Sequence, residues 1–532
     1  MGAIPDYSSS VIFKSPFPDV TIPDTTLTPY VLRHAEKLKD KVAIVEAGSG
    51  RSYTYGRLAN HVGRVAAGLH GRGFGKSEVL AILSPNVPEY PIAFHGVASA
   101  GGVNTTLNPL YTADEIAFQL RDSRARFLLT VPPLMEKAKA AAGKSDVKEI
   151  FVFGEAEGAT PFASLLGEGT PPSPDLDPAE DLVALPYSSG TTGFSKGVML
   201  THRNLVSNLA QTSVLQDIGE DEKIIAVLPF FHIYGMQVIM NQGLFRGATI
   251  VSMPRFELEP FLQAIQEHGI TRLFLAPPIV VALAKHPLVD KYDMSTVQVV
   301  FSGAAPLDAD TARLCGERIG CRVSQGYGLT ETSPVSHSVP DRAPHVVPGS
   351  VGPSLPNTDC KVVDVATGEE LGAGQDGEIW IRGPQVMKGY LNNDEATRSS
   401  IDGDGFLHTG DIGHIDDRGE YFIVDRLKEL IKYKGFQVPP AELEAILLAH
   451  PKVADAAVIG IPEDEAGEIP KGFVVLRDPG VTPDELMAFV AEKVAPHKKI
   501  RRLEVVEEIP KSASGKILRR VLKDREKAAA TG

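Results

Sequence analysis

Cysteine is scarce in this chain: Cys315, Cys321 and Cys360 are the three examples among 532 residues. An odd count does not suit a framework of disulfides, and these positions lack the spacing of a metal-binding cluster. The composition therefore disfavours both a disulfide scaffold and a structural cysteine–metal site. It predicts a protein of the reducing cytoplasm.

Positive charge is also in short supply. Lys and Arg number 53 against 67 Asp and Glu, which gives a formal net charge of −14. This acidic balance argues against nonspecific nucleic-acid binding as the main role, although a local basic groove for an anionic ligand stays possible. We therefore expect no nucleic-acid partner.

Long apolar runs are missing as well. No stretch reaches the roughly 20 residues that a membrane-spanning helix needs. The N-terminal Met-Gly-Ala-Ile-Pro lacks the basic and apolar regions of a signal peptide. These absences predict no stable insertion into a membrane.

What the chain does contain is a regular alternation of short apolar runs and helical patterns. Its 43% hydrophobic and 23% charged residues are those of an ordinary soluble protein, but 532 residues are many for one domain. The alternation predicts α/β layers. Near residue 426 the pattern resets, and a helix beginning at Pro440 and strands at 454–461 and 472–477 follow. We expect a large α/β domain of several layered subdomains over 1–426 and a small α+β domain over 427–532.

Three threonines indicate where helices begin. Thr112 and Thr482 each stand three positions before a Glu, which is the capping-box pattern, and Pro483 suits the first helical position. Thr201 is the expected N-cap of a helix after the apolar run 198–200.

The stretch 187–204 is dense in hydrogen-bond donors. It reads Tyr-Ser-Ser-Gly-Thr-Thr-Gly-Phe-Ser-Lys-Gly-Val-Met-Leu-Thr-His-Arg-Asn, with six Ser and Thr hydroxyls and one lysine ammonium. Its glycines let the backbone turn sharply and approach a ligand closely. Such a combination can cradle a polyanion such as a triphosphate. The candidate phosphate-binding residues are Ser188, Ser189, Gly190, Thr191, Thr192, Gly193 and Lys196.

The spacing in this stretch is not the common phosphate-loop pattern, in which Gly-Lys precedes a hydroxyl that holds magnesium. Here Gly197 follows Lys196, and most of the hydroxyls come before it. A polar surface turn is the alternative explanation, and for Gly/Ser/Thr runs in general it is the commoner one. The run resembles the nucleotide-phosphate loop of the adenylate-forming enzymes, which include acyl-CoA synthetases, luciferases and the adenylation domains of peptide synthetases.

Four further segments resemble the same family, in the same order. They are Gly-Tyr-Gly-Leu-Thr-Glu at 326–331, His-Thr-Gly-Asp at 408–411, Arg-Leu-Lys-Glu-Leu-Ile-Lys-Tyr-Lys-Gly at 426–435 and Pro-Lys-Ser-Ala-Ser-Gly-Lys at 510–516. The resemblance runs essentially from end to end and is nearest to the 4-coumarate–CoA ligases. It implies an acid–CoA ligase that uses ATP, Mg²⁺ and CoA, forms an acyl-adenylate and releases pyrophosphate and then AMP.

The resemblance places the nucleotide at the second and third of these segments. It implies that Tyr327 lies against adenine, that Thr330 contacts the α-phosphate and that Glu331 helps to hold Mg²⁺, a hard cation that prefers oxygen. An Asp and an Arg can both grip a ribose diol. The nucleotide residues implied outside the phosphate stretch are Ala304, Gln325, Gly326, Tyr327, Thr330, Asp411 and Arg426. Each motif alone has an ordinary explanation: a strand-ending turn or a surface ion pair.

The resemblance also implies a mobile small domain. Lys516 would contact the substrate carboxylate and α-phosphate, where negative charge gathers during attack on phosphorus. Lys428 matches the family's hinge, and rotation about it would present different groups for the two steps. The residues implied on the CoA side are Lys432, Lys434, Gly435 and Gln437, of which Lys432 and Gln437 act in thiol transfer. Without the resemblance, lysines such as these are solvated surface charges.

The carboxylic acid is expected near the aromatic segment 230–234. The resemblance places His232 at the tunnel between the acid and CoA sites. The implied lining residues are Tyr234, Val238, Phe301, Ala304, Gly326, Pro334 and Val335. Most are small or apolar, which suits a flat aromatic acid, and Tyr234 favours a para-hydroxyl as in 4-coumarate or caffeate. Val238 and Phe301 differ from the usual plant pattern, so the choice of acid stays open, and buried core aromatics are the ordinary explanation of the segment.

Three alternatives stay open from the sequence. A medium- or long-chain fatty acyl-CoA synthetase would share every motif except the pocket. An acyl-AMP ligase would pass its product to a carrier protein instead of free CoA. A phosphate-loop ATPase or nucleotide-binding regulator would release ADP and phosphate instead of AMP and pyrophosphate.

Overall fold

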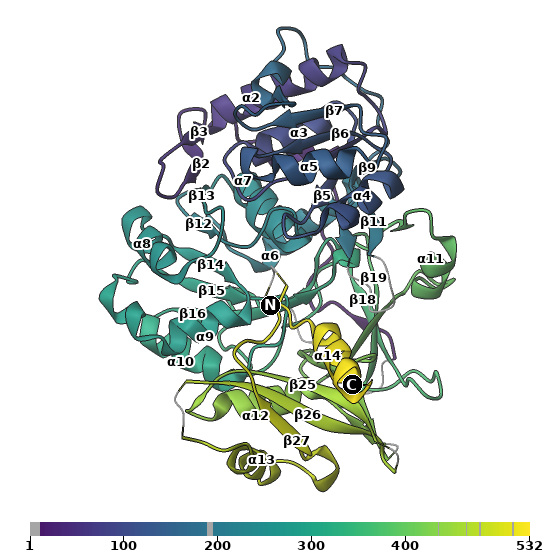
Figure 1. The fold of residues 1–532 in the computed structure, drawn as a ribbon. Coiled ribbons are helices and arrows are strands. Elements are labelled where there is room, and N and C mark those ends of the chain that lie inside the picture. The colour runs from purple at the N-terminus through teal and green to yellow at the C-terminus, as the bar shows by residue number, and fades with distance from the viewer. Residues whose placement is uncertain are drawn as a thin grey trace.

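Four β-sheets organise the molecule in a computed structural model that describes residues 11–188, 195–434, 436–463, 465–477, 480–512 and 515–531. Figure 1 shows the first sheet at the top, the second below it, strands β18 Asp359–Val363 and β19 Gly377–Arg382 of the third at the right and the smaller C-terminal unit at the bottom. The predicted architecture, a large α/β part followed by a small α+β part, is confirmed.

The first sheet has nine strands, in the order β10-β11-β9-β5-β4-β6-β7-β8 with β20 added to β11. Its central strands are parallel and apolar, as strands covered by helices on both faces are. The strands are β4 Val79–Leu83, β5 Val103–Leu107, β6 Ala125–Thr130, β7 Glu149–Val152, β8 Thr160–Pro161, β9 Leu182–Ala184, β10 Tyr187–Ser188, β11 Lys196–Thr201 and β20 Gly389–Tyr390. The helices nearby are α2 Tyr55–Gly71, α3 Tyr90–Ser99, α4 Ala113–Asp122 and α5 Met135–Ala142, with the 3₁₀ turns η1 Pro132–Leu134 and η2 Phe162–Leu165.

The second sheet has eight strands, in the order β17-β16-β15-β14-β12-β13-β2-β3. They are β2 Val42–Glu46, β3 Ser52–Thr54, β12 Lys223–Ala226, β13 Thr249–Ser252, β14 Arg272–Leu275, β15 Val299–Ser302, β16 Arg322–Gly328 and β17 Val335–Ser338. Its helical elements are α1 Leu27–Val31, α6 His202–Leu215, the π-helix η3 Tyr234–Asn241, α7 Gln242–Arg246, α8 Leu258–His268, α9 Pro277–Lys285, η4 Pro287–Lys291, α10 Ala309–Ile319 and η5 Thr330–Thr332. Strands β12, β14, β15 and β16 run parallel, so their carboxyl ends meet at one edge.

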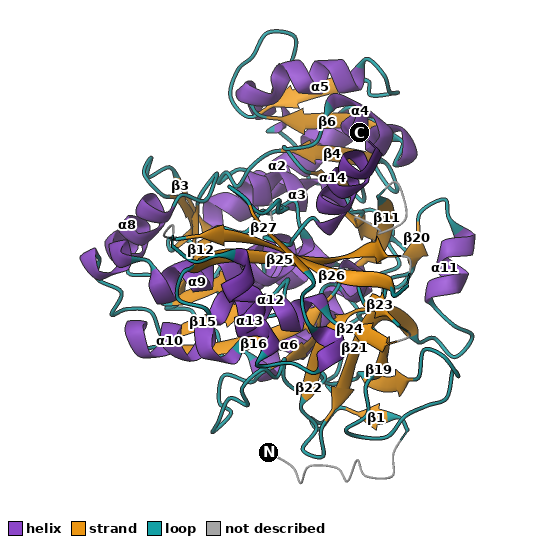
Figure 2. Ribbon diagram, turned by 60° about the horizontal axis from the view of Figure 1, so that its bottom comes forward, coloured by secondary structure: helices purple, strands orange, loops and turns teal. Residues whose placement is uncertain are grey.

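The third sheet is antiparallel and ends in β22 at Arg426, while the fourth begins with β23 at Ile431. The third consists of β1 Phe13–Lys14, β18 Asp359–Val363, β19 Gly377–Arg382, β21 Leu407–Ile415 and β22 Tyr421–Arg426, with helix α11 Asp394–Ser400 alongside. The fourth consists of β23 Ile431–Tyr433, β24 Phe436–Val438, β25 Val453–Glu463, β26 Gly467–Leu476 and β27 Arg502–Val505, with α12 Pro440–Ala449, α13 Pro483–Ala491, η6 Pro496–Lys498 and α14 Arg519–Thr531. Figure 2 shows β25 and β26 crossing in front of the rest of the molecule.

The fourth sheet has apolar cores of its own. One is built on Ile431, Leu443, Val458 and Leu486, and a second lies under α14 around Phe473. The largest cluster of buried apolar residues belongs to the first two sheets and extends from Leu27 to Leu407. The small unit therefore has the independent core that a mobile domain needs.

The three helices predicted to begin after a threonine do begin there. Thr112, Thr201 and Thr482 are N-caps, each accepting a hydrogen bond from the backbone N–H three positions on. These contacts span one turn, which is why short-range patterns predict them. No helix among the described residues is both long enough and apolar enough to cross a membrane.

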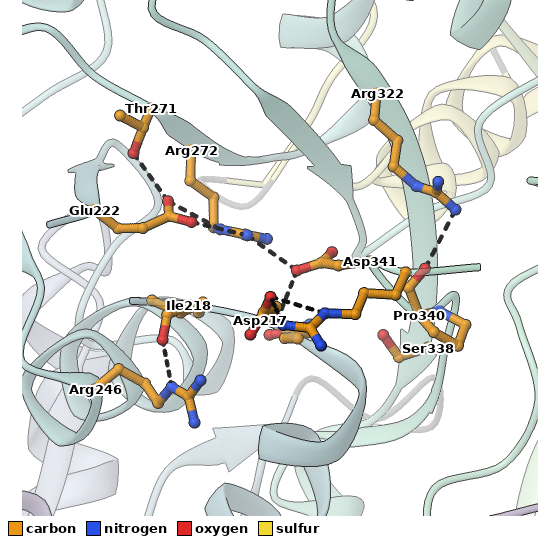
Figure 3. Close-up of polar contacts among 12 residues, drawn as sticks. Asp217, Ile218, Glu222, Arg246, Thr271, Arg272, Arg322, Ser338, Pro340 and Asp341 are labelled. Atoms are coloured by element: carbon orange, nitrogen blue, oxygen red, sulfur yellow. Dashed lines mark hydrogen bonds and ion pairs between the residues drawn. The ribbon is translucent and has the colours of Figure 1, made fainter. Parts of the chain in front are cut away.

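Buried charges lie at the amino ends of the second sheet's strands (Figure 3). The side chain of Arg272, 3% exposed, contacts Glu222 at 3.1 Å and Asp341 at 2.9 Å. Thr271 donates to the same Glu222 carboxylate. This network ties β14 to the segment before β12 and to the loop after β17, at the edge opposite the carboxyl ends.

Candidate active site

The carboxyl edge of the second sheet carries the predicted site residues that belong to that sheet and its loops. Ligands of open α/β sheets bind at this edge because loops leave the strands there. The segment 230–234 follows β12, Ala276 follows β14, Ala304 follows β15, and Gln325 and Tyr327 lie at the end of β16. Figure 1 places these strand ends between the second sheet and the small C-terminal unit.

Tyr327, Asp411 and Arg426 come together on the nucleotide side. The Tyr327 hydroxyl donates to Asp411 Oδ2 at 2.6 Å, and Arg426 Nε lies 3.4 Å from Asp411 Oδ1. Asp411 and Arg426 face each other across β21 and β22. Burial raises the pKa of the Asp411 carboxyl, and the charge of Arg426 and the Tyr327 hydrogen bond oppose that rise. Three residues from two sheets thus form one polar cluster.

Glu331 lies where the phosphate stretch meets the first sheet. Its Oε1 accepts hydrogen bonds from Ser188 Oγ at 3.0 Å and from the Tyr390 hydroxyl at 2.9 Å. The Lys196 ammonium lies 4.6 Å from the centre of the Tyr390 ring. The two ends of the phosphate stretch therefore flank this carboxylate. The predicted residues Ser189, Gly190, Thr191, Thr192 and Gly193 lie outside the described residues.

A single carboxylate at this place fits magnesium. Mg²⁺ is commonly held by one or two carboxylates together with substrate phosphates. In the described part of the chain, no group of three or more His, Cys, Asp or Glu side chains gathers to hold an ion. Glu331 is thus the residue that would hold Mg²⁺, alongside the phosphates of a nucleotide.

Lys516 reaches this cluster from the small unit. Gly515, just before Lys516, packs on the start of α9, because a Cβ placed on this glycine would lie only 3.0 Å from Ala276 Cβ. Its φ of +82° is a backbone conformation that glycine adopts readily. Burial, and after it the charge of Arg426, lower the pKa of Lys516 to about 8, while Glu429 and Asp411 act in the opposite direction. The ammonium therefore sits among the groups of the nucleotide side.

His232 lies on the acid side of Lys516. Burial lowers its pKa to about 4, and the positive charge of Lys516 acts in the same direction. Its Nδ1 accepts a hydrogen bond from the Tyr234 N–H at 3.3 Å, so the neutral ring carries its proton on Nε2. The π-helix η3 follows at once, and such helices often mark functional sites. A Cβ on Gly235 would lie 2.1 Å from Pro229 O, so glycine permits this tight turn.

Three of the predicted acid-pocket residues, Tyr234, Phe301 and Gly326, are neighbours. The Tyr234 hydroxyl donates to Phe301 O at 3.3 Å, which leaves its lone pairs able to accept from a ligand. A Cβ on Gly326 would lie 2.4 Å from Phe301 Cζ, and Ala304 has a φ of +72°. Of the predicted lining residues, Val238, Pro334 and Val335 are buried, whereas Gly326 is partly exposed and Ala304 is exposed. Gln325 exchanges two hydrogen bonds with the Leu307 backbone and so fixes the loop that carries Ala304.

A family model of AMP-binding enzymes matches residues 31–391, and a model of the AMP-binding enzyme C-terminal domain matches 442–516. The chain belongs to the AMP-binding enzymes. It is 44% identical to 4-coumarate–CoA ligase 5 of Oryza sativa subsp. japonica, over 98% of each chain. The anthranilate CoA ligase AuaEII in complex with anthranoyl-AMP has a TM-score of 0.89 at 27% identity and covers 96% of this chain and 99% of its own. ATP-bound MatB of Rhodopseudomonas palustris has a TM-score of 0.84 at 31% identity, with 94% and 99% covered. This AMP-binding enzyme is an acid–CoA ligase that uses ATP.

The residues expected on the CoA side of this AMP-binding enzyme lie on the β23–β24 hairpin. Lys432 and Gln437 are direct cross-strand partners with exposed side chains. Lys434 takes a left-handed backbone conformation, with a φ of +49°, and Gly435 lies outside the described residues. Their role in thiol transfer stays a prediction.

Tyr390 is a site residue of the AMP-binding enzyme that the sequence did not indicate. It reaches Glu331 through β20, which pairs with the phosphate strand β11 at Val198. A Gly-Tyr pair has no special meaning locally, and only the pairing of two strands distant in sequence brings it to the site. Thr330, one residue before Glu331, is partly exposed at the same edge, and its contact with the α-phosphate stays a prediction.

Proposed function

We propose that this AMP-binding enzyme converts a hydroxycinnamate, 4-coumarate or a close relative, to its CoA thioester through an acyl-adenylate. The observation that carries the proposal is the position of Lys516, between the Asp411–Arg426 pair and His232. The Lys516 ammonium is close enough to interact electrostatically with Arg426 and Asp411 on the nucleotide side and with His232. The similarity to 4-coumarate–CoA ligases supports the acid class.

In the first step, a carboxylate oxygen of the acid attacks the α-phosphorus of ATP. The new O–P bond forms as the bond to pyrophosphate breaks, which gives the acyl-adenylate. Two anions crowd together in this transition state, so a fixed ammonium stabilises it more than it stabilises the separate reactants. Lys516 supplies that charge, Thr330 contacts the α-phosphate, and Asp411 with Arg426 holds the ribose.

Mg²⁺ would neutralise phosphate charge when it is bound with ATP at Glu331. The Glu331 carboxylate is oriented for this by the Ser188 and Tyr390 hydroxyls. Because both hydroxyls donate to Oε1, the carboxylate is held in one rotamer at the end of the phosphate stretch.

In the second step, the CoA thiolate attacks the acyl carbon and AMP leaves with the electrons of the C–O bond. An unperturbed thiol has a pKa of about 8.5, so about a few per cent of the CoA thiol is present as the thiolate near neutral pH. We infer that the small domain, whose boundary we place between residues 426 and 427, rotates about Lys428 so that Lys432 and Gln437 replace Lys516 for this step.

The test is product analysis of the purified enzyme with ATP and a panel of cinnamic, benzoic and fatty acids, with and without CoA. We expect AMP and pyrophosphate, acid-dependent exchange of labelled pyrophosphate into ATP without CoA, and thioesters mainly of hydroxycinnamates. ADP and phosphate as products would refute the proposal. A preference for fatty acids would refute the assignment of hydroxycinnamates as substrates. An adenylate that does not react with CoA would indicate a carrier protein as the acceptor.

The first step should have an alkaline limit set by Lys516. Because its pKa is lowered to about 8 by burial and by Arg426, the ammonium is present below that pH and is lost above it. We expect kcat/KM of pyrophosphate exchange to fall as the pH rises past about 8, since this constant reports groups of the free enzyme. The Lys516→Arg variant stays charged at alkaline pH, so its remaining activity should not fall above about pH 8. A flat profile through the alkaline range in the native enzyme would contradict the assignment.

Gly326→Ala should narrow the acid pocket. Its new Cβ would lie 2.4 Å from Phe301 Cζ, so the Phe301 ring and the new methyl group cannot both keep these positions. We expect kcat/KM for 4-coumarate to fall about 10- to 100-fold, as steric changes in apolar pockets do, and to fall less for short aliphatic acids. Gly219→Ala, which meets no atom within 4 Å, is the matched control. Restoration by Phe301→Leu in the same chain would establish the steric cause, and an equal loss for every acid would contradict it.

A further inference from the structure

Helix α12 of the small domain begins without a cap of its own. Pro439 stands at the N-cap position and makes no side-chain capping bond within the described structure, and Pro440, the first helical residue, has no N–H. The first N–H that needs an acceptor is that of Ala441. It donates at 2.8 Å to Asp425 Oδ2, the carboxylate of the residue just before Arg426.

The other end of α12 is also held from the large domain. The Lys285 ammonium, at the end of α9, donates to Leu448 O at 3.1 Å, in the last turn of α12. A carboxylate at the amino end and an ammonium at the carboxyl end both complement the helix dipole. Figure 2 shows α12 beside α9, in agreement with this contact.

An ion pair joins α12 to Arg519, which lies three residues after Lys516. Glu444, one turn into α12, accepts two hydrogen bonds from Arg519 Nη2, at 2.8 and 2.7 Å. Arg519 also pairs with Glu429 and donates from Nε to Val458 O at 3.2 Å. Arg519 opens α14 three residues after Lys516. The orientation of α12 therefore fixes the orientation of the lysine's turn.

We propose that Asp425 and Lys285 are positioning residues that grip α12 at its two ends and thereby hold Lys516 in the adenylate-forming orientation. The inference rests on the proposed function, because it assumes that the small domain takes a second orientation for thiol transfer. Rotation about Lys428 carries α12 away from both groups, so their loss weakens one orientation and leaves the other untouched.

The test compares two half-reactions of the full-length enzyme. Adenylate formation is measured as acid-dependent pyrophosphate exchange, and thiol transfer as CoA thioester formation from supplied 4-coumaroyl-adenylate. Asp425→Ala and Lys285→Ala should each lower the ratio of the first rate to the second by about tenfold or more, the effect of losing one hydrogen bond to a charged group. Asp425→Asn, which keeps an acceptor, should recover part of the loss.

Two controls separate positioning from general stability. Thr482→Ala removes the cap of α13, a contact that lies wholly inside the small domain. Lys291→Ala removes an exposed lysine a short distance beyond α9. Both should leave the ratio unchanged. Circular dichroism shows whether each variant is folded. If Asp425→Ala is not folded, Lys285→Ala provides the test, because the Lys285 side chain is only partly buried and its removal should not unfold the protein.

The proposal is overturned if the two variants leave the ratio unchanged, or if the controls lower it equally. Failure of the proposed function would look different: the native enzyme itself would show no acid-dependent exchange with any member of the acid panel.

Discussion

Replacing Lys516 with alanine is expected to lower acid-dependent pyrophosphate exchange by about a hundred- to a thousandfold, the usual effect of removing one preorganised group that stabilises developing charge. The loss should be this large because the ammonium is partly buried beside Arg426 and Asp411, where water cannot replace it. Thioester formation from supplied acyl-adenylate should change little, since that step needs no charge at the α-phosphorus. Stopped assays of the two half-reactions measure both quantities.

Lys511→Ala is the matched control for this substitution. Lys511 lies in the same segment but pairs with Asp455 inside the small domain. Its removal should cost little, as for other ion pairs near the surface. If Lys516→Ala kept normal exchange, or if Lys511→Ala were equally defective, the role given to Lys516 would be wrong.

The sequence predicts those parts of the site whose functional residues lie close together within one short segment. The Gly-Tyr-Gly segment brings Tyr327 to the end of β16, and the His-Thr-Gly-Asp segment places Asp411 within β21, where the two side chains meet. The apolar run 182–186 contains strand β9, and the run 198–200 lies within β11, as the sequence indicates. Such segments are identifiable because residue type and spacing together specify both the turn and the donors.

Other parts depend on contacts between distant segments. The π-helix after His232 carries no distinct periodicity over two turns, so the sequence indicates the aromatic segment but not its geometry. Asp425 resembles any polar residue of a strand, and only the two prolines that open α12 hint that its cap comes from elsewhere. A missing cap is a usable signal, because the free N–H groups of a buried helix end need acceptors.

Buried charge is the feature that sequence predicts least well. Arg272 and Asp341 are of types that usually lie at the surface, yet their side chains are 3% and 6% exposed. Nothing in the sequence separates this pair from the neighbouring Arg342–Asp217 pair, whose side chains are 81% and 53% exposed. The difference arises from the tertiary fold, which places Arg272 beside Asp341 and Glu222 in the network of Figure 3.

Asp341→Ala is therefore expected to destabilise the large domain by about 3–5 kcal/mol, because it leaves the Arg272 guanidinium buried with part of its charge uncompensated. Asp341 also accepts from the Asp217 N–H at 2.9 Å, so the loop after β17 loses an anchor as well. Calorimetry should show a melting temperature lowered by several degrees. Pyrophosphate exchange measured well below that temperature should be retained, since the cluster lies at the edge of the sheet opposite the active site.

Arg342→Ala breaks the neighbouring exposed pair and provides the comparison. Exposed pairs contribute about 0–1 kcal/mol, since water screens both charges with or without the partner. The two variants alter adjacent residues of one loop, so any general sensitivity of the loop affects both. Equal melting temperatures for the two variants would show that Glu222 alone satisfies Arg272, and that the contact with Asp341 contributes no more than a surface pair. A large difference, with Asp341→Ala the less stable, would show that burial decides the energy of these contacts.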